Sequence, residues 1–226
     1  MSHKTAFLIF AQSATAESKQ IPNAELLFEQ LNLDILKKVR QTNMPYFVSN
    51  EQDQVGNDFG AKLTNALSKV FKKGYDYVIT VGNDTPEITT GILKKSIKNT
   101  AKKKLTFGPS KDGGFYLMTF SKKEFQSEEY QKLPWQTSSL VKNTLLLLNN
   151  KSNHKLVLLS PLKDIDTLTD LTSLFLQHNH ISLALKELFK LLIFIKKTKV
   201  FYKNSHFTSF INTCFYNKGS PIFLSL

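Results

Sequence analysis

The sequence predicts a doubly wound α/β fold with a mixed, mainly parallel sheet. Apolar strand patterns alternate with amphipathic helix patterns through the first hundred residues, which is typical of strands that are covered by helices on both faces. Residues 75–81 (YDYVITV) form a mostly apolar run, as expected for a strand buried inside a parallel sheet. The 226 residues, 41% of them hydrophobic, are enough for one domain with a sizeable core.

Three strand-helix units are expected in the first half of the chain. Asn23 is expected to cap the first helix, and Gly74 to end the second. Thr85 is expected to cap the third helix, with Pro86 at its first position. The expected elements are a strand at 5–11, a helix at 23–42, a strand at 45–49, a helix at 58–73, a strand at 75–81 and a helix from 86 onward.

The second half departs from this alternation. Residues 104–108 and 115–120 read as two strands without room for a helical crossover between them. A helix at 138–149, a strand at 155–160 and a helix near Thr167 complete the expected sheet. We therefore expect an α/β domain over residues 1–178, followed by an appendage over 179–226.

The appendage is basic and aromatic. Residues 171–226 contain 7 Lys and 1 acidic residue, and residues 181–197 have the pattern of a helix that packs on the body. Binding of a membrane surface or a partner through this segment is the alternative to ordinary packing.

Composition limits the classes of function. The net charge is +12, but 29 of the 30 basic residues are Lys and Arg40 is the only arginine, so the guanidinium groups that nucleic-acid sites favour are nearly absent. Anionic small molecules are therefore expected ahead of nucleic acid. A single cysteine, Cys214, excludes an intramolecular disulfide. No apolar run reaches the roughly 18 residues of a membrane span, so a cytoplasmic location is expected.

Polar residues that follow apolar strands are the candidates for a site, because ligands of open α/β sheets bind at the carboxyl ends of the strands. Three places qualify: Asp84 in "VGNDTP", Asp112 in the turn "GPSKDGG", and the pair Asp164 and Asp166 in "KDIDT". Each also has a local interpretation as a turn or a helix cap. Together they match the carboxylates with which Mg²⁺ or Mn²⁺ is held against a diphosphate.

Four motifs in series carry a family resemblance. "VGNDTPEIT", "FGPSKDGGFYLM", "LPWQTSSLVKNT" and "KDIDTLTDL" resemble the glycosyltransferase-like radical-SAM/selenodomain-associated transferases. That family is similar to the molybdenum-cofactor and other cofactor-biosynthesis guanylyltransferases, which have the three-layer, Rossmann-like GT-A fold of nucleotide-diphospho-sugar transferases. The resemblance covers roughly residues 5–175 and includes "NDFGAKLTNAL", in which Lys62 stands where the family usually has Arg.

The resemblance implies a nucleotide or nucleotide-sugar donor, an acceptor of unknown identity and a divalent metal, Mg²⁺ or Mn²⁺. It places the metal on Asp84, with Asp166 or Asp164 as the second ligand, and Asp112 as the group that orients or deprotonates the acceptor. Trp135 and Thr137 would belong to a loop over the pocket, although a tryptophan beside a proline is also a common core residue. The other implied binding residues are Lys19, Lys62, Gly82, Asn83, Gly108, Pro109, Gly113 and Gly114.

The loop after the first strand departs from the family pattern. "FAQSATAESKQIP" has no glycine and no arginine, so Lys19 is its only candidate cation for a phosphate group. The expected function is a glycosyl- or nucleotidyltransferase that uses a divalent metal. The alternative is a catalytically degenerate module that keeps the fold and serves in binding or interaction.

Overall fold

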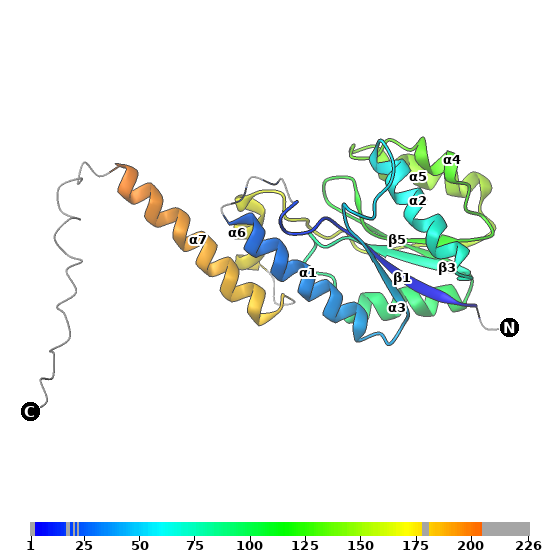
Figure 1. Cartoon of the computed structure of the whole chain (residues 1–226), viewed down its shortest axis with the longest axis horizontal. Helices are drawn as coiled ribbons and strands as arrows, with labels where there is room; N and C mark the ends of the chain where they lie inside the picture. Colours follow the sequence, from blue (N-terminus) through cyan, green and yellow to red (C-terminus); the bar gives the residue numbers. More distant parts are fainter. Residues whose placement is uncertain (1–2, 17–18, 20, 22, 178–180, 205–226) are drawn as a thin grey trace, which may run out of the picture.

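The computed structural model describes residues 3–16, 19, 21, 23–177 and 181–204, and a six-stranded sheet lies at its centre (Figure 1). The strands are β1 (Thr5–Phe10), β2 (Tyr46–Ser49), β3 (Tyr77–Val81), β4 (Lys104–Pro109), β5 (Phe115–Ser121) and β6 (Lys155–Leu158). Their order is β2-β1-β3-β5-β4-β6, in which β5 is antiparallel to β3 and β4 and the other three pairs are parallel. The predicted mixed, mainly parallel sheet is confirmed.

Helices cover both faces of the sheet and make three layers (Figure 1). One face carries α2 (Phe59–Lys72), α4 (Ser127–Gln131) and α5 (Leu140–Lys151), and the other carries α1 (Ala24–Arg40) and α3 (Thr90–Ala101). Successive side chains of a strand point to opposite faces. Accordingly Ala6 and Leu8 belong to the core under α2, whereas Phe7 and Ile9 belong to the core under α1 and α3.

Of the two predicted N-caps, Asn23 has the predicted position but does not cap the helix, and Thr85 is wrong. Asn23 stands before α1, but its backbone is left-handed (φ 54°) and its side chain makes no capping hydrogen bond. The third helix, α3, begins at Thr90 rather than at Pro86, and Thr89 caps it by accepting a hydrogen bond from the Ile92 amide at 3.2 Å. Residues 82–89 therefore form a polar loop at the end of β3, where Thr85 makes a contact described below. Gly74, with a φ of +91°, follows α2 as predicted.

The last described helices pack against α1. α6 (Leu168–Gln177) and α7 (Leu183–Asn204) share an apolar cluster with α1, in which Leu27, Leu171 and Phe189 are fully buried. The predicted packing of a helix from the 181–197 segment on the body is confirmed, whereas the domain boundary at 178 stays a prediction. Residues 205–226 of the predicted appendage lie outside the described residues. None of the helices within the described ranges has the length and hydropathy that a membrane span requires.

Candidate functional site

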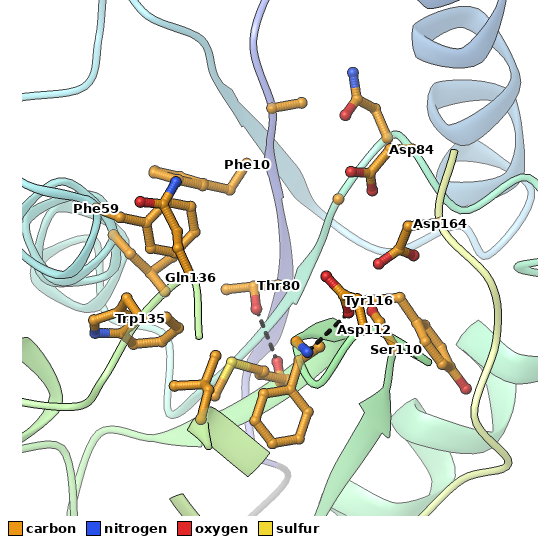
Figure 2. A pocket seen from close by; sticks show the side chains of 18 of the residues that line it. Phe10, Phe59, Thr80, Asp84, Ser110, Asp112, Tyr116, Trp135, Gln136 and Asp164 are labelled. Carbon is orange, nitrogen blue, oxygen red and sulfur yellow. Dashed lines mark hydrogen bonds between the residues drawn. The ribbon is translucent and has the colours of Figure 1, made fainter. Parts of the chain in front are cut away.

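Three polar segments meet at one edge of the sheet. β3, β4 and β6 run in the same direction, so the residues that follow them lie at the same edge. These residues include Asp84 after β3, Asp112 after β4, and Asp164 and Asp166 after β6, and all four line a cavity of about 730 Å³. Figure 2 shows Asp84, Asp112 and Asp164 in this cavity. The gathering predicted from the three separate motifs is present in the structure.

Backbone hydrogen bonds tie the three segments together. The Ile165 amide donates to the Asp84 carbonyl oxygen at 2.9 Å, which joins the segment after β6 to the loop after β3. The Lys111 amide donates to the Leu162 carbonyl at 2.9 Å, and the Leu162 amide donates to the Pro109 carbonyl at 3.2 Å. These bonds extend the pairing of β4 with β6 beyond the strands, so the carboxylates are carried on one connected framework.

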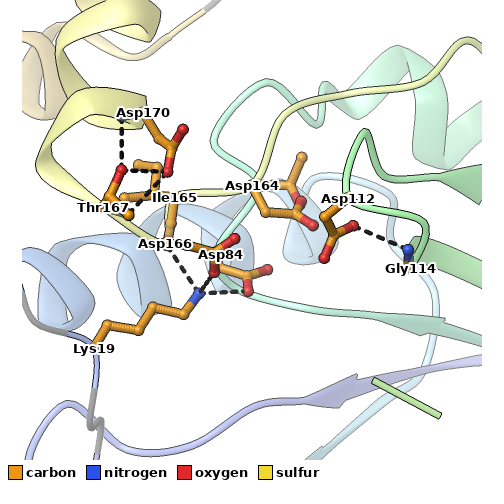
Figure 3. Close-up of polar contacts among 10 residues, drawn as sticks. Lys19, Asp84, Asp112, Gly114, Asp164, Ile165, Asp166, Thr167 and Asp170 are labelled. Atoms are coloured by element: carbon orange, nitrogen blue, oxygen red, sulfur yellow. Dashed lines mark hydrogen bonds and ion pairs between the residues drawn. The ribbon is translucent and has the colours of Figure 1, made fainter. Parts of the chain in front are cut away.

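Lys19 lies between two of the carboxylates (Figure 3). Its Nζ is 2.8 Å from Asp84 Oδ2 and 3.0 Å from Asp166 Oδ1, and it donates to the Ile165 carbonyl oxygen at 2.8 Å. Burial alone would lower the pKa of Lys19, but the charges and hydrogen bonds of Asp84 and Asp166 outweigh it and raise that pKa. The lysine is therefore a charged group at the position predicted for a metal ion.

Asp164 is the buried carboxylate of the group. Thr85 Oγ1 donates a hydrogen bond to Asp164 Oδ1, which explains why Thr85 does not cap a helix. Burial and the charge of Asp84 raise the pKa of Asp164 well above its usual range, with a smaller contribution from Asp112, although hydrogen bonds from Ser110 and Thr85 oppose the shift. Asp164 therefore loses its proton less readily than an exposed aspartate does.

The glycine-rich segment at residues 108–114 forms a turn, and some of its residues also line the cavity. Gly113 has a φ of +99°, and an added Cβ there would lie 2.6 Å from Ser138 Cα, so the turn packs closely on the loop before α5. Asp112 Oδ1 accepts a hydrogen bond from the Gly114 amide at 2.9 Å, and this bond orients the carboxylate (Figure 3). Gly108 packs under the Tyr116 ring, where a Cβ would lie 2.3 Å from Cζ.

An aromatic wall forms the other end of the cavity (Figure 2). The rings of Phe59 and Trp135 are 5.2 Å apart, and those of Phe10 and Phe59 are 5.5 Å apart. Trp135 is held in place because its Nε1 donates to the Tyr130 carbonyl oxygen at 2.7 Å. Gln136, the next residue, has a left-handed backbone (φ 58°) and also lines the cavity. Sequence reasoning found Trp135 but missed Phe10, Phe59 and Gln136, because no local pattern distinguishes them from core or loop residues.

Most of the residues predicted for the site line this cavity. They are Lys19, Lys62, Gly82, Asn83, Asp84, Asp112, Gly114, Trp135, Thr137, Asp164 and Asp166. Asn83 also donates from its side chain to Asn32 Oδ1 on α1 at 2.8 Å, which fixes the loop after β3. Of the described residues predicted to bind substrate, Gly108, Pro109 and Gly113 do not line the cavity. Their positions fit a structural role in the strand end and the turn.

The donor set suits a divalent cation only in part. Within the described part of the chain, no three His, Cys, Asp or Glu side chains form a group that could hold a metal ion. Asp84 and Asp166 nevertheless offer oxygen atoms to one common cation, since the Lys19 ammonium group contacts both. Mg²⁺ is commonly held by one or two carboxylates together with phosphate oxygens, and two carboxylates meet that requirement.

Comparisons with known proteins bear on the fold. Residues 32–137 match the profile of a family described as an uncharacterized protein conserved in bacteria (DUF2064). A candidate nucleotide-diphospho-sugar transferase from Desulfovibrio desulfuricans has 20% sequence identity and a TM-score of 0.73, over 85% of this chain and 98% of its own. The chain has the nucleotide-diphospho-sugar transferase fold. The GT-A-like architecture expected from the motifs is thereby confirmed, because this likeness spans nearly the whole of that structure.

Two further solved structures are more distant. A 4-diphosphocytidyl-2C-methyl-D-erythritol synthase from Anaerococcus prevotii is 14% identical with a TM-score of 0.48, over 78% of this chain and 97% of its own. A manganese complex of a Mycobacterium tuberculosis protein is 13% identical with a TM-score of 0.45, over 77% of this chain and 100% of its own. Among curated proteins, no sequence matches this chain.

Proposed function

We propose that this chain is a transferase that moves a glycosyl or nucleotidyl group from a nucleotide donor with the help of Mg²⁺ or Mn²⁺. The observation that carries the proposal is the cavity itself, which combines an acidic end with two nearby lysines and an aromatic end in a nucleotide-diphospho-sugar transferase fold. We also propose that the chain is one of the radical-SAM/selenodomain-associated transferases, and that residues 1–178 form the catalytic domain.

The two ends of the cavity suit the two substrates of a transferase, the donor and the acceptor. Lys19 and Lys62 both line it and carry positive charge toward a diphosphate group. The rings of Phe10, Phe59 and Trp135 offer flat apolar surface, on which a planar or apolar group packs favourably. A donor with a diphosphate near the carboxylates and an acceptor near the loop at Trp135 would use both ends.

Asp84 and Asp166 are the residues that would hold the metal ion. A bound metal ion would neutralise the charge of the diphosphate leaving group. Asp112 orients the acceptor or deprotonates it: when an acceptor hydroxyl attacks the donor, a carboxylate oxygen of Asp112 takes the hydroxyl proton. Its hydrogen bond from the Gly114 amide holds that carboxylate in one orientation. Trp135 and Gln136 line the cavity, where they would contact the acceptor.

The test is a panel of nucleotides and nucleotide sugars, with and without Mn²⁺. Trp135 is the only tryptophan of the chain and lines the cavity, so its fluorescence reports binding alongside the shift of the melting temperature. A ligand at a hundred times its dissociation constant stabilises the native protein by about 2.7 kcal/mol, which is readily measured. We expect one nucleotide class to give a Mn²⁺-dependent shift that Asp84→Asn removes and Asp53→Asn, an exposed carboxylate outside the cavity, keeps.

A second candidate is a degenerate module that binds a nucleotide without transferring a group. The observation in its favour is that Lys19, the only candidate cation of the loop after β1, already contacts two carboxylates. The two candidates differ in turnover. Consumption of the bound donor, followed by phosphorus NMR, supports the transferase, whereas binding with no donor consumed over many hours supports the module.

A further inference from the structure

The Lys19 ammonium group has the surroundings of a bound cation. Asp84 Oδ2, Asp166 Oδ1 and the Ile165 carbonyl oxygen lie within 3.0 Å of its Nζ, so each of its three N–H donors has an oxygen acceptor (Figure 3). The same Nζ lies 5.3 Å from the centre of the Phe28 ring, whose face attracts a positive charge. The protein itself therefore supplies a cation at this point.

Two of these three oxygen atoms belong to the residues that would hold the metal ion. A divalent cation binds carboxylate oxygens at about 2.0–2.1 Å when it is Mg²⁺, which is closer than an ammonium group approaches them. An ammonium group and a divalent cation on the same two oxygens would also repel each other strongly, because the site is partly shielded from water. Only one of the two cations can occupy the position at a time.

We infer that Lys19 competes with the divalent cation for Asp84 and Asp166, so that the metal binds only when Lys19 leaves the carboxylates. Lys19 also lines the cavity, and its four-carbon stem lets the ammonium group reach a diphosphate there. Metal binding and diphosphate binding then favour each other, since each is easier once Lys19 has moved from the carboxylates to the phosphate oxygens. The inference rests on the proposed function and adds a coupling between the donor and the metal.

Mn²⁺ binding, followed by electron paramagnetic resonance of the free ion, tests the competition directly. We expect Lys19→Met to bind Mn²⁺ at least about tenfold more tightly than the wild type, since close charge pairs of this kind have large coupling energies. The matched control is Lys62→Met, which removes the same charge from the same cavity, and we expect it to change the affinity by less than about threefold. An unchanged or weaker affinity in Lys19→Met, or an equal gain in both variants, would overturn the inference.

A second measurement uses the wild-type protein and does not depend on how the variants fold. The rate at which acetic anhydride modifies Lys19, measured by mass spectrometry, should rise severalfold when Mn²⁺ is added, because the displaced amine is no longer enclosed by carboxylates. A rate that falls or stays constant while Mn²⁺ binds contradicts the competition. Both experiments use the metal alone, so they give an answer even when the nucleotide panel finds no ligand and the proposed function fails.

Discussion

Replacement of Gly108 by alanine tests whether this glycine serves packing rather than a ligand. A Cβ at this position would lie 2.3, 2.4 and 2.8 Å from three atoms of the Tyr116 ring. Nonbonded carbon atoms prefer about 3.5–4.0 Å, so the ring would have to retreat by roughly 1 Å. It has little room to do so, because Tyr116 is 2% exposed and its hydroxyl donates to the Ser160 carbonyl oxygen at 3.2 Å.

Overpacking of this kind costs about 1–3 kcal/mol of unfolding free energy. For a chain of this size, 1 kcal/mol corresponds to about 2–4 °C in melting temperature, so Gly108→Ala should melt several degrees lower than the wild type. Gly91→Ala is the matched control, because Gly91 is in α3 and a Cβ there meets only Thr89 Oγ1, at an ordinary 3.5 Å. That change should stabilise the protein by about 0.4–1 kcal/mol.

Urea unfolding followed by circular dichroism measures both variants. A Gly108→Ala protein as stable as the wild type would refute the assignment of this residue to packing under Tyr116. The packing role is supported when Gly108→Ala is destabilised but binds the nucleotide found in the panel as tightly as the wild type, after correction for the unfolded fraction. That result would also remove Gly108 from the binding residues.

The remaining predictions concern helix capping, acid stability and the aromatic wall. Thr89→Ala should lower the unfolding free energy by about 1 kcal/mol in a urea titration, because it removes the cap of α3, and an effect within 0.3 kcal/mol of zero would speak against the cap. Burial opposes the ionisation of Glu124, but hydrogen bonds from Ser152, the Asn153 amide and His154 lower its pKa. Its contribution to stability is therefore complete above the unfolded pKa of about 4.5 and is lost as the pH falls through the lower folded pKa. The stability difference between the wild type and Glu124→Gln should accordingly shrink between pH 6 and pH 3, and a difference that grows would contradict this sign. Phe59→Leu should weaken the binding of any ligand that quenches Trp135 fluorescence by about two- to tenfold, since an aromatic contact contributes about 0.5–1.5 kcal/mol, whereas Phe125→Leu, at a ring that packs on Phe71 outside the cavity, should not.

Much of the fold could be predicted from the sequence, because strands and helices leave patterns among residues that are close in the sequence. The apolar run before Asp84 predicted a buried strand. The close spacing of residues 104–108 and 115–120 predicted two strands without a helical crossover, which the structure pairs antiparallel as β4 and β5. The candidate carboxylates were also found from the sequence, since each follows a strand and parallel strands end at the same edge. The prediction failed at Thr85, which has every local feature of a helix cap but bonds to Asp164, 79 residues away.

The sequence by itself determined all six strands, most of the helices and which polar residues follow the strands, but not α4 or the start of α3. Only the tertiary structure decided what those polar residues contact. Lys19 was a candidate for binding phosphate, and the folded chain places it against Asp84, 65 residues away, and Asp166. Phe10, Phe59 and Trp135 became one wall because three separate segments meet at the cavity. The physical reason is the distance along the chain over which each signal acts. Helix and strand patterns depend on neighbours in the sequence, whereas charge pairs, ring contacts and long-range hydrogen bonds form between whichever groups the folded chain brings within a few ångströms.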